Sequence, residues 1–194
     1  MKHLGRKLFH VFGGLGLLSL YFVFGRKTAL GLYGALAVLA SAFEVARLRV
    51  PALNRFFHSH FGSFIRVSEA HRPTGTVPYI LGVGIAFWAF STPAASAAVC
   101  FLAFGDVVAT TVGERFGKTR IGNKSLEGTA AFTAAALLAG LSLSLAGIGM
   151  PPWILILGAL IAAFVELLPL PVNDNFAIPV LAGAAMELAL RWRQ

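Results

Sequence analysis

The stretch LFHVFGGLGLLSLYFVF, residues 8–24, contains no Asp, Glu, Lys or Arg, and it is long enough to cross a bilayer, which takes roughly 20 mostly apolar residues. Similar stretches recur along the chain, in which 57% of the 194 residues are hydrophobic and only 12% are charged. This composition predicts an all-α fold, a polytopic integral membrane helix bundle that occupies residues 1–194 as a single domain. We expect about seven transmembrane helices, at 8–24, 28–46, 76–92, 94–113, 129–147, 152–168 and 176–190.

The Lys and Arg side chains predict how these spans are oriented. Twelve of the 16 fall at the N-terminus or after the second and fourth spans, on one side, and four fall on the other side. Because cytoplasmic loops carry the excess of positive charge, we place the N-terminus in the cytoplasm and the C-terminus outside. The same bias explains the net charge of +8 without a nucleic-acid partner, since no basic stripe interleaved with aromatic residues is present.

Two segments refine this topology. The N-terminus has the charged-then-apolar order of a signal peptide, but FVFGRK, residues 22–27, offers no small-residue cleavage site, so we expect a retained first span. The segment PALNRFFHSHFGSFIR, residues 51–66, is too polar and too short to span. Its mixture of Arg, His and Phe predicts an interfacial helix on the cytoplasmic side.

Several carboxylates lie toward the predicted cytoplasmic ends of the spans. Because an ionisable group costs free energy inside a bilayer, such residues indicate a functional site. Glu44, Asp106 and Glu166 lie toward the C-terminal ends of even-numbered spans, where the helix dipole disfavours a carboxylate by about 0.3–1 kcal/mol. Glu44 either pairs with Arg47, three residues on, or takes part in catalysis. Asp106 has no basic residue within one turn, so its expected partner is Mg²⁺, with a hydrogen bond inside the bundle as the alternative.

The segment GNKSLEGT, residues 122–129, opens the fifth predicted span and predicts an anion site. Asn123 or Ser125 can cap the helix, and Lys124 adds a full charge beside the unpaired N–H groups of its first turn. Glycine-rich backbone followed by Lys-Ser and a helix start uses the same physics as phosphate sites in other folds, although the spacing is not that of a P-loop. Gly113 is alternatively a small residue that lets helices approach closely.

Five segments, taken in order, resemble the CTP-dependent polyprenol kinase family, which includes dolichol, phytol and farnesol kinases and the CTP-dependent diacylglycerol kinase. They are RKLFHVFGG (6–14), Glu44 with Arg47, GDVVATTVGERFGK (105–118), KSLEGTAAF (124–132) and ELLPLPVNDNFAIP (166–179). The pairing of GD-x-x-A-x-x-x-G with K-S-x-E-G-[ST], and then E…DN-x-x-I-P, is specific, and the match spans nearly the whole chain. The short chain resembles the compact prokaryotic and plastid-type members of the family. As a prokaryotic-type member it is expected in a prokaryotic inner (cytoplasmic) membrane, with an active site that faces the cytoplasm.

The resemblance implies transfer of the γ-phosphoryl group of CTP to the hydroxyl of a membrane isoprenoid alcohol or diacylglycerol, with Mg²⁺ as cofactor and 105–128 as the catalytic motif region. The implied catalytic residues are Asp106, Lys124, Asp174, Glu166, Glu44 and His10. The implied metal ligands are Asp106, Asp174 and Glu127. Nucleotide binding falls to Gly113, Gly117, Lys118, Arg120, Lys124, Ser125, Gly128, Asn173 and Asn175. Structural alternatives stay open for His10 as a buried histidine, for Glu127 as a first-turn carboxylate, and for the two asparagines as caps.

Two other classes of function remain open. A cytidylyltransferase that forms a CDP-lipid is similar in the central region, but VNDNFAIP, residues 172–179, departs from the C-terminal signature of those enzymes. A small transporter would carry polar residues through the depth of the membrane or an internal repeat, and the sequence has neither. The abundant Gly and Ala of the spans fit tight helix packing, within one chain or in a homo-oligomer.

Overall fold

The computed structural model describes residues 4–65 and 69–193, which fold almost entirely into helices. The predicted all-α membrane bundle is confirmed, and each predicted span overlaps a helix. Lys2 and Arg66 contributed to the charge count, and Arg66 also ends the predicted interfacial segment, but both lie outside the described residues.

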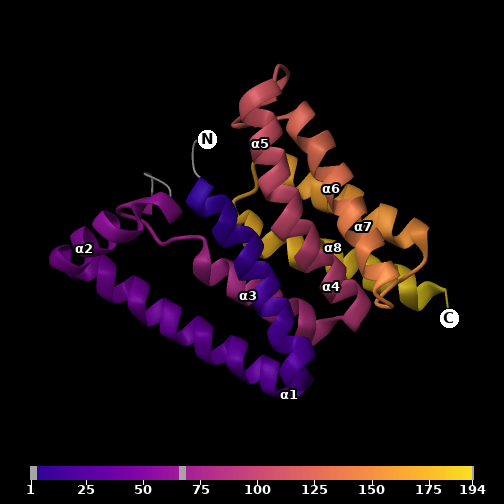
Figure 1. Cartoon of the computed structure of the whole chain (residues 1–194), viewed down its shortest axis with the longest axis horizontal. Coiled ribbons are helices and arrows are strands. Elements are labelled where there is room, and N and C mark those ends of the chain that lie inside the picture. The colour runs from indigo at the N-terminus through magenta and orange to yellow at the C-terminus, as the bar shows by residue number, and fades with distance from the viewer. Residues whose placement is uncertain (1–3, 66–68, 194) are drawn as a thin grey trace.

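The first helix, α1 (Leu4–Arg49), contains the first two predicted spans and kinks at Gly25. Gly25 has φ 75° and ψ 164°, a conformation that glycine adopts without the steric cost that a Cβ atom brings. The kink divides α1 into a first leg, residues 4–24, and a second leg, residues 26–49. Figure 1 shows the two legs diverging from the kink, with α3 (Thr76–Ala89) between them.

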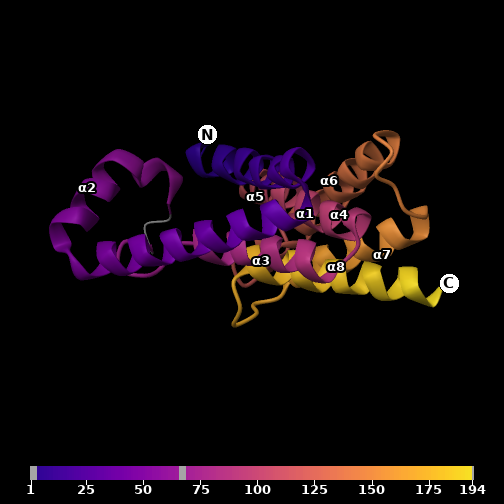
Figure 2. The same cartoon turned by 90° about the horizontal axis from the view of Figure 1, so that it is seen from below.

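Helix α2 (Pro51–Phe61) and a 3-10 turn, η1 (Gly62–Phe64), bring the chain from the second leg back toward the first. Proline at the start of α2 suits a first helical position, because its missing N–H would have no partner there. Figures 1 and 2 show α2 at one end of the molecule and the C-terminal end of the chain at the other. The predicted helix is confirmed as far as Phe61, and its place at a membrane interface stays a prediction.

The fourth predicted span is a continuous helical run of 25 residues, Thr92–Phe116. It consists of α4 (Thr92–Cys100), a π-helical turn, η3 (Phe101–Gly105), and α5 (Asp106–Phe116). Asp106 follows the π-helical turn directly, and α5 continues for more than two turns beyond it. The expected dipole penalty at Asp106 is therefore wrong, because the dipole acts only within the last turn of a helix.

A short hairpin separates α5 from α6 (Leu126–Leu145). Strand β1 (Arg120–Ile121) pairs antiparallel with β2 (Lys124–Ser125), so that Ile121 lies opposite Lys124. Gly122 makes the turn with φ 58°. The hairpin thus places Lys124 and Ser125 directly at the start of α6.

Two more helices, α7 (Pro152–Leu167) and α8 (Asp174–Trp192), complete the bundle, with α8 packed against α7, α3 and α4. Helices α1 and α6 and the run 92–116 are long and apolar enough to cross a membrane, whereas α3 and α7 are apolar but shorter. Helix α8 belongs to neither group, although 176–190 was predicted to span. The number of crossings and the cytoplasmic N-terminus stay predictions.

Candidate active site

Lys124 joins two carboxylates that lie far from it in the sequence. Its Nζ donates to Glu166 Oε1 at 2.7 Å and to Asp174 Oδ2 at 3.0 Å. The three residues come from β2, the last turn of α7 and the first turn of α8, so the predicted convergence of these segments is present in the structure. Glu166 is buried, which makes its charge costly without the ammonium group beside it.

The surroundings of Lys124 keep it charged. Its partial burial by itself lowers the pKa, but the negative charges of Asp174 and Glu166 outweigh burial and raise the pKa above its ordinary value of 10.5. An ammonium group has three donors, and the two carboxylates accept two of them. The remaining donor can contact a further acceptor.

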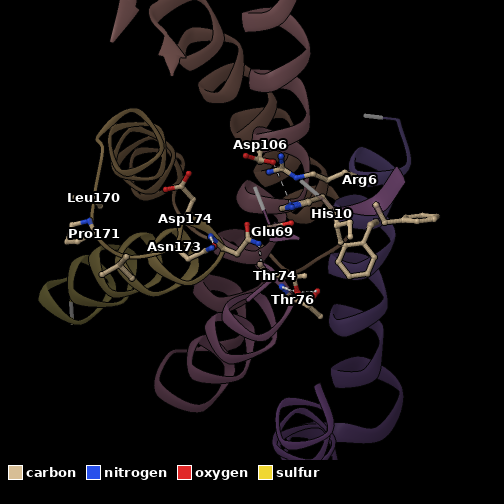
Figure 3. A pocket seen from close by; sticks show the side chains of 16 residues that line it. Arg6, His10, Glu69, Thr74, Thr76, Asp106, Leu170, Pro171, Asn173 and Asp174 are labelled. Atoms are coloured by element: carbon tan, nitrogen blue, oxygen red, sulfur yellow. Dashed lines mark hydrogen bonds and ion pairs between the residues drawn. The ribbon is translucent and has the colours of Figure 1, made fainter. Parts of the chain in front are cut away.

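Asp106 gains basic neighbours from α1. His10 Nδ1 lies 3.7 Å from Asp106 Oδ2, both residues are buried, and Figure 3 shows Arg6 and His10 extending from the first leg toward Asp106. The His10 ring stacks on Tyr79 at 5.3 Å between centroids, and the Tyr79 hydroxyl donates to the backbone oxygen of His10 at 2.8 Å. The sequence search for basic partners within one turn of Asp106 therefore missed partners on another helix.

Two polar cavities meet at this cluster. The first has a volume of about 390 Å³ and is lined by Arg6, His10, Glu69, Thr74, Asp106 and Asn173–Asn175, among others. The second has a volume of about 410 Å³ and is lined by Arg6, Asp106, Arg120, Lys124, Ser125, Glu166 and Asp174, among others. Arg6, Asp106 and Asp174 line both cavities, so a charged boundary joins them.

Ser125 and nearby glycines form one wall of the second cavity. Ser125 is the N-cap of α6, as predicted, and its Oγ accepts from the N–H of Gly128 at 3.1 Å. A Cβ atom on Gly128 would lie 2.9 Å from Ala109 O, and one on Gly117 would lie 2.7 Å from Ser125 Oγ. Gly113 and Gly128 both line the second cavity. Small residues here let α5 and α6 approach closely and leave room beside the cap.

The two asparagines predicted to bind nucleotide make local contacts. Asn173 is the N-cap of α8, and its Oδ1 accepts from the N–H of Asn175 at 3.0 Å. Asn175 Nδ2 donates to Gly75 O at 2.9 Å and ties α8 to the segment before α3. Both residues line the first cavity and not the second. The contacts of Asn173 therefore match its alternative interpretation as a helix cap.

Glu44 lies in a buried network centred on Arg47. Arg47 Nη2 donates to Glu44 Oε2 at 2.7 Å, and Glu44 also accepts from the Thr74 N–H at 2.9 Å and the Thr74 hydroxyl at 3.2 Å. Arg47 is 0% exposed and donates as well to Asn54 and to backbone oxygens. Because both charged groups are satisfied by this network, we assign Glu44 a structural role, and Thr74 connects it to the first cavity.

The remaining predicted residues lie at the edge of the site or outside it. Glu127 accepts from the backbone N–H of Thr119 at 3.1 Å, so it supports the hairpin and lines neither cavity. Arg120 lines the second cavity and donates to Gly113 O at 3.4 Å. Lys118 is exposed and lines neither cavity.

The carboxylates around the second cavity fit a Mg²⁺ ion only in part. Among the described residues, no group of three or more His, Cys, Asp or Glu is placed to hold a metal by itself. Mg²⁺ in nucleotide sites, however, usually takes one or two carboxylates together with phosphate oxygens and water. Asp106 and Asp174 both line this cavity and fit that smaller role, whereas Glu127 does not.

Arg6 is the main lining residue that sequence reasoning did not select. It entered as one of the positive charges near the N-terminus and as the first residue of the RKLFHVFGG segment, without an assigned role, yet it lines both cavities. Arg6 and His10 are four residues apart, so they lie on one face of the first leg. That spacing, in the same segment as the family motif, is the signal that could have identified Arg6.

The fold and these cavities define a polytopic membrane protein with a charged site inside its helix bundle. The chain is 30% identical to CTP-dependent diacylglycerol kinase 1 of Schizosaccharomyces pombe, over 76% of this chain and 74% of the relative. It is 31% identical to CTP-dependent diacylglycerol kinase 1 of Eremothecium gossypii, over 97% of this chain and 68% of that relative. Probable phytol kinase 3, chloroplastic, of Glycine max is 29% identical over 92% and 60%. No protein-family model and no solved structure matches the chain.

The identity and coverage of these relatives show that the chain belongs to the CTP-dependent polyprenol kinase family. The resemblance seen in the sequence motifs is thereby confirmed. The motif residues Asp106, Lys124 and Asp174 are also the residues that line the second cavity.

Proposed function

We propose that this chain is a kinase that transfers the γ-phosphoryl group of CTP to the hydroxyl of a membrane isoprenoid alcohol or diacylglycerol. The observation that carries the proposal is the pair of adjoining cavities with Arg6, Asp106 and Asp174 between them. Two substrates that exchange a phosphoryl group need such adjoining sites with charged groups at the boundary. The diacylglycerol and phytol kinases among its relatives support the choice of CTP and of a lipid alcohol.

The second cavity suits the triphosphate of the nucleotide. Arg6, Arg120 and Lys124 supply positive charge, and the Ser125 cap lies at the N-terminal end of α6, where the helix dipole favours an anion. The third donor of Lys124 is available to a phosphate oxygen while Glu166 and Asp174 hold the other two. Glu166 and Asp174 thus position the ammonium group for the nucleotide.

Asp106, with Asp174 as a second ligand, would hold the Mg²⁺ that accompanies the triphosphate, and this ion would neutralise charge on the β- and γ-phosphates. The lipid hydroxyl oxygen attacks the γ-phosphorus from the first cavity. The bond from the γ-phosphorus to the β–γ bridging oxygen breaks, CDP leaves, and the hydroxyl proton passes to a base. We assign His10 as that base, because its ring lines the first cavity beside Asp106.

Transfer from a labelled nucleotide tests this function. The purified protein is incubated in vesicles with γ-labelled or α-labelled CTP and with phytol, geranylgeraniol, a polyprenol or dioleoylglycerol. We expect a labelled lipid from the γ position alone. In a parallel incubation phosphatidate replaces the alcohol, and label from the α position of CTP would there identify a cytidylyltransferase. No lipid labelled from γ-labelled CTP with any alcohol would overturn the proposal.

We place the site on the cytoplasmic face of a prokaryotic inner membrane, because the Lys and Arg bias favours that side and CTP is a cytosolic substrate. Single cysteines are introduced at Thr119, Val172 and Ile148 in a Cys100→Ala background. The first two flank the cavities and should react with a membrane-impermeant thiol reagent only from the cytoplasmic side, and Ile148 only from outside. Reaction of Thr119 and Val172 positions from opposite sides would contradict this topology.

A further inference from the structure

An apolar groove of about 360 Å³ runs beside the first cavity, between the legs of α1 and the start of α3. The first leg contributes Phe9, Gly16 and Leu20, the second leg contributes Leu36, and α3 contributes Thr76 and Ile80. The groove is lined almost wholly by hydrocarbon, and it lies where Figure 1 shows the legs diverging.

The groove adjoins the first cavity. Phe9 and Thr76 line both of them, so the polar end of a molecule in the groove would enter the first cavity. In that cavity, Asp106 also lines the second cavity, and His10 lies beside it, with Nδ1 3.7 Å from Asp106 Oδ2. A lipid alcohol has the matching chemistry, with a hydrocarbon chain and a hydroxyl at one end.

We propose that this groove binds the hydrocarbon chain of the lipid acceptor and directs its hydroxyl into the first cavity, an inference that rests on the proposed kinase function. Phe9 and Leu20 are eleven residues apart on one helix, a rise of about 16 Å. The hydrocarbon core of a bilayer is about 30 Å thick, so the groove reaches through about one leaflet. The hydrocarbon chain of a lipid in one leaflet fits this length, and it can enter the groove laterally from the bilayer, between the two legs of α1.

A separate apolar cavity beside α2, of about 380 Å³, lies among Phe43, Phe57, Phe61 and Phe64 and also adjoins the first cavity. It is bordered by Glu44 and by α2, whose 51–61 segment is the polar, predicted interfacial helix. With α2 at the membrane interface, as predicted, this level would correspond to the headgroup region and not to the hydrocarbon core. We therefore assign the hydrocarbon chain of the lipid to the groove along the first leg.

Gly16 allows a clean test of the groove. A Cβ atom on Gly16 would have no atom within 4 Å, so leucine fits there without displacing the protein and extends into the groove. Gly31, on the second leg, is likewise exposed with no atom within 4 Å, and it lines neither the groove nor the polar cavities. Both substitutions replace a helical glycine by leucine, so Gly31→Leu controls for the change in helix propensity.

The Michaelis constants for lipid and CTP are measured for the wild-type protein, Gly16→Leu and Gly31→Leu, with dioleoylglycerol and with phytol. We expect Gly16→Leu to raise the constant for the lipid about tenfold or more and to leave that for CTP unchanged. Gly31→Leu should resemble the wild type in both. Equal lipid constants for Gly16→Leu and the wild type would overturn the proposal.

A long-chain alcohol that carries a diazirine group gives a readout independent of catalysis. Its photochemical label should map to residues 8–20 in the wild type and Gly31→Leu, and should be lost in Gly16→Leu. Label on residues 57–64 instead would overturn the groove in favour of the cavity beside α2. Label in the groove of a wild-type protein that transfers no phosphoryl group would support the groove and contradict the proposed function.

Discussion

Replacement of Lys124 by methionine tests the centre of the charged site. Methionine keeps most of the apolar stem and removes the ammonium group that contacts Glu166 at 2.7 Å and Asp174 at 3.0 Å. Glu166 has 4% of its side chain exposed and would then keep a buried charge without this partner. We expect the variant to be less stable and to bind CTP more weakly.

The expected loss of stability in Lys124→Met can be judged from how deeply the paired side chains are buried. Removing one partner of a buried ion pair costs about 3–5 kcal/mol. Lys124 and Asp174 have 29% and 25% of their side chains exposed, so water screens part of the interaction. We therefore expect a loss near the lower limit, about 3 kcal/mol.

A double-mutant cycle in detergent measures this coupling. Unfolding is compared for the wild type, Lys124→Met, Glu166→Gln and the double variant, with Lys27→Met as a control on an exposed lysine at the kink. The neutral amide that Glu166→Gln introduces needs no cation, so the double variant should lose less stability than the two single variants together, with a coupling of about 1–3 kcal/mol. Additive losses, or a Lys124→Met variant as stable as Lys27→Met, would refute the ion-pair reasoning.

Three further predictions concern the same site. Asp106→Asn should fold and insert normally but lose about a hundredfold or more in turnover, because it removes charge from the boundary between the cavities; a wild-type rate would place the metal ligand elsewhere. Glu44→Gln should destabilise the protein by about 3 kcal/mol, because buried Arg47 loses its counter-charge, while turnover per folded molecule stays unchanged; a stable but inactive variant would return Glu44 to catalysis. The stability difference between the wild type and Lys124→Met should be complete at neutral pH and disappear as the pH rises above 10.5, since the folded protein raises the pKa of Lys124; a difference that persists at high pH would contradict this.

The sequence was sufficient for the fold class and for the segments that form the site. Apolar stretches of spanning length predicted the helices, and the kink at Gly25 lies between the first two predicted spans. Motif residues predicted that Lys124 and Asp174 would share a site, and their 3.0 Å contact agrees with that placement. These features depend on local periodicity and on the ends of helices, which a sequence records directly.

Contacts between distant helices were not predictable in the same way. The approach of His10 to Asp106 depends on how the first leg packs against η3 and α5, and periodicity does not give that packing. The π-helical turn before Asp106 lies in an ordinary apolar segment, with no sequence signal that we recognised. Lys124 was expected to bind phosphate, and its direct contacts with two carboxylates were not predicted, because they depend on how residues from three segments converge.

A lipid-alcohol kinase forms one molecule of lipid phosphate for each CTP that it converts to CDP. The most direct measurement counts both products by mass spectrometry, with the purified protein in vesicles that contain one lipid alcohol and Mg²⁺. We expect equal amounts of CDP and lipid phosphate from the wild type, and only small residual amounts of either product from Asp106→Asn. Pyrophosphate with a cytidylylated lipid, or CDP without lipid phosphate, would contradict this stoichiometry.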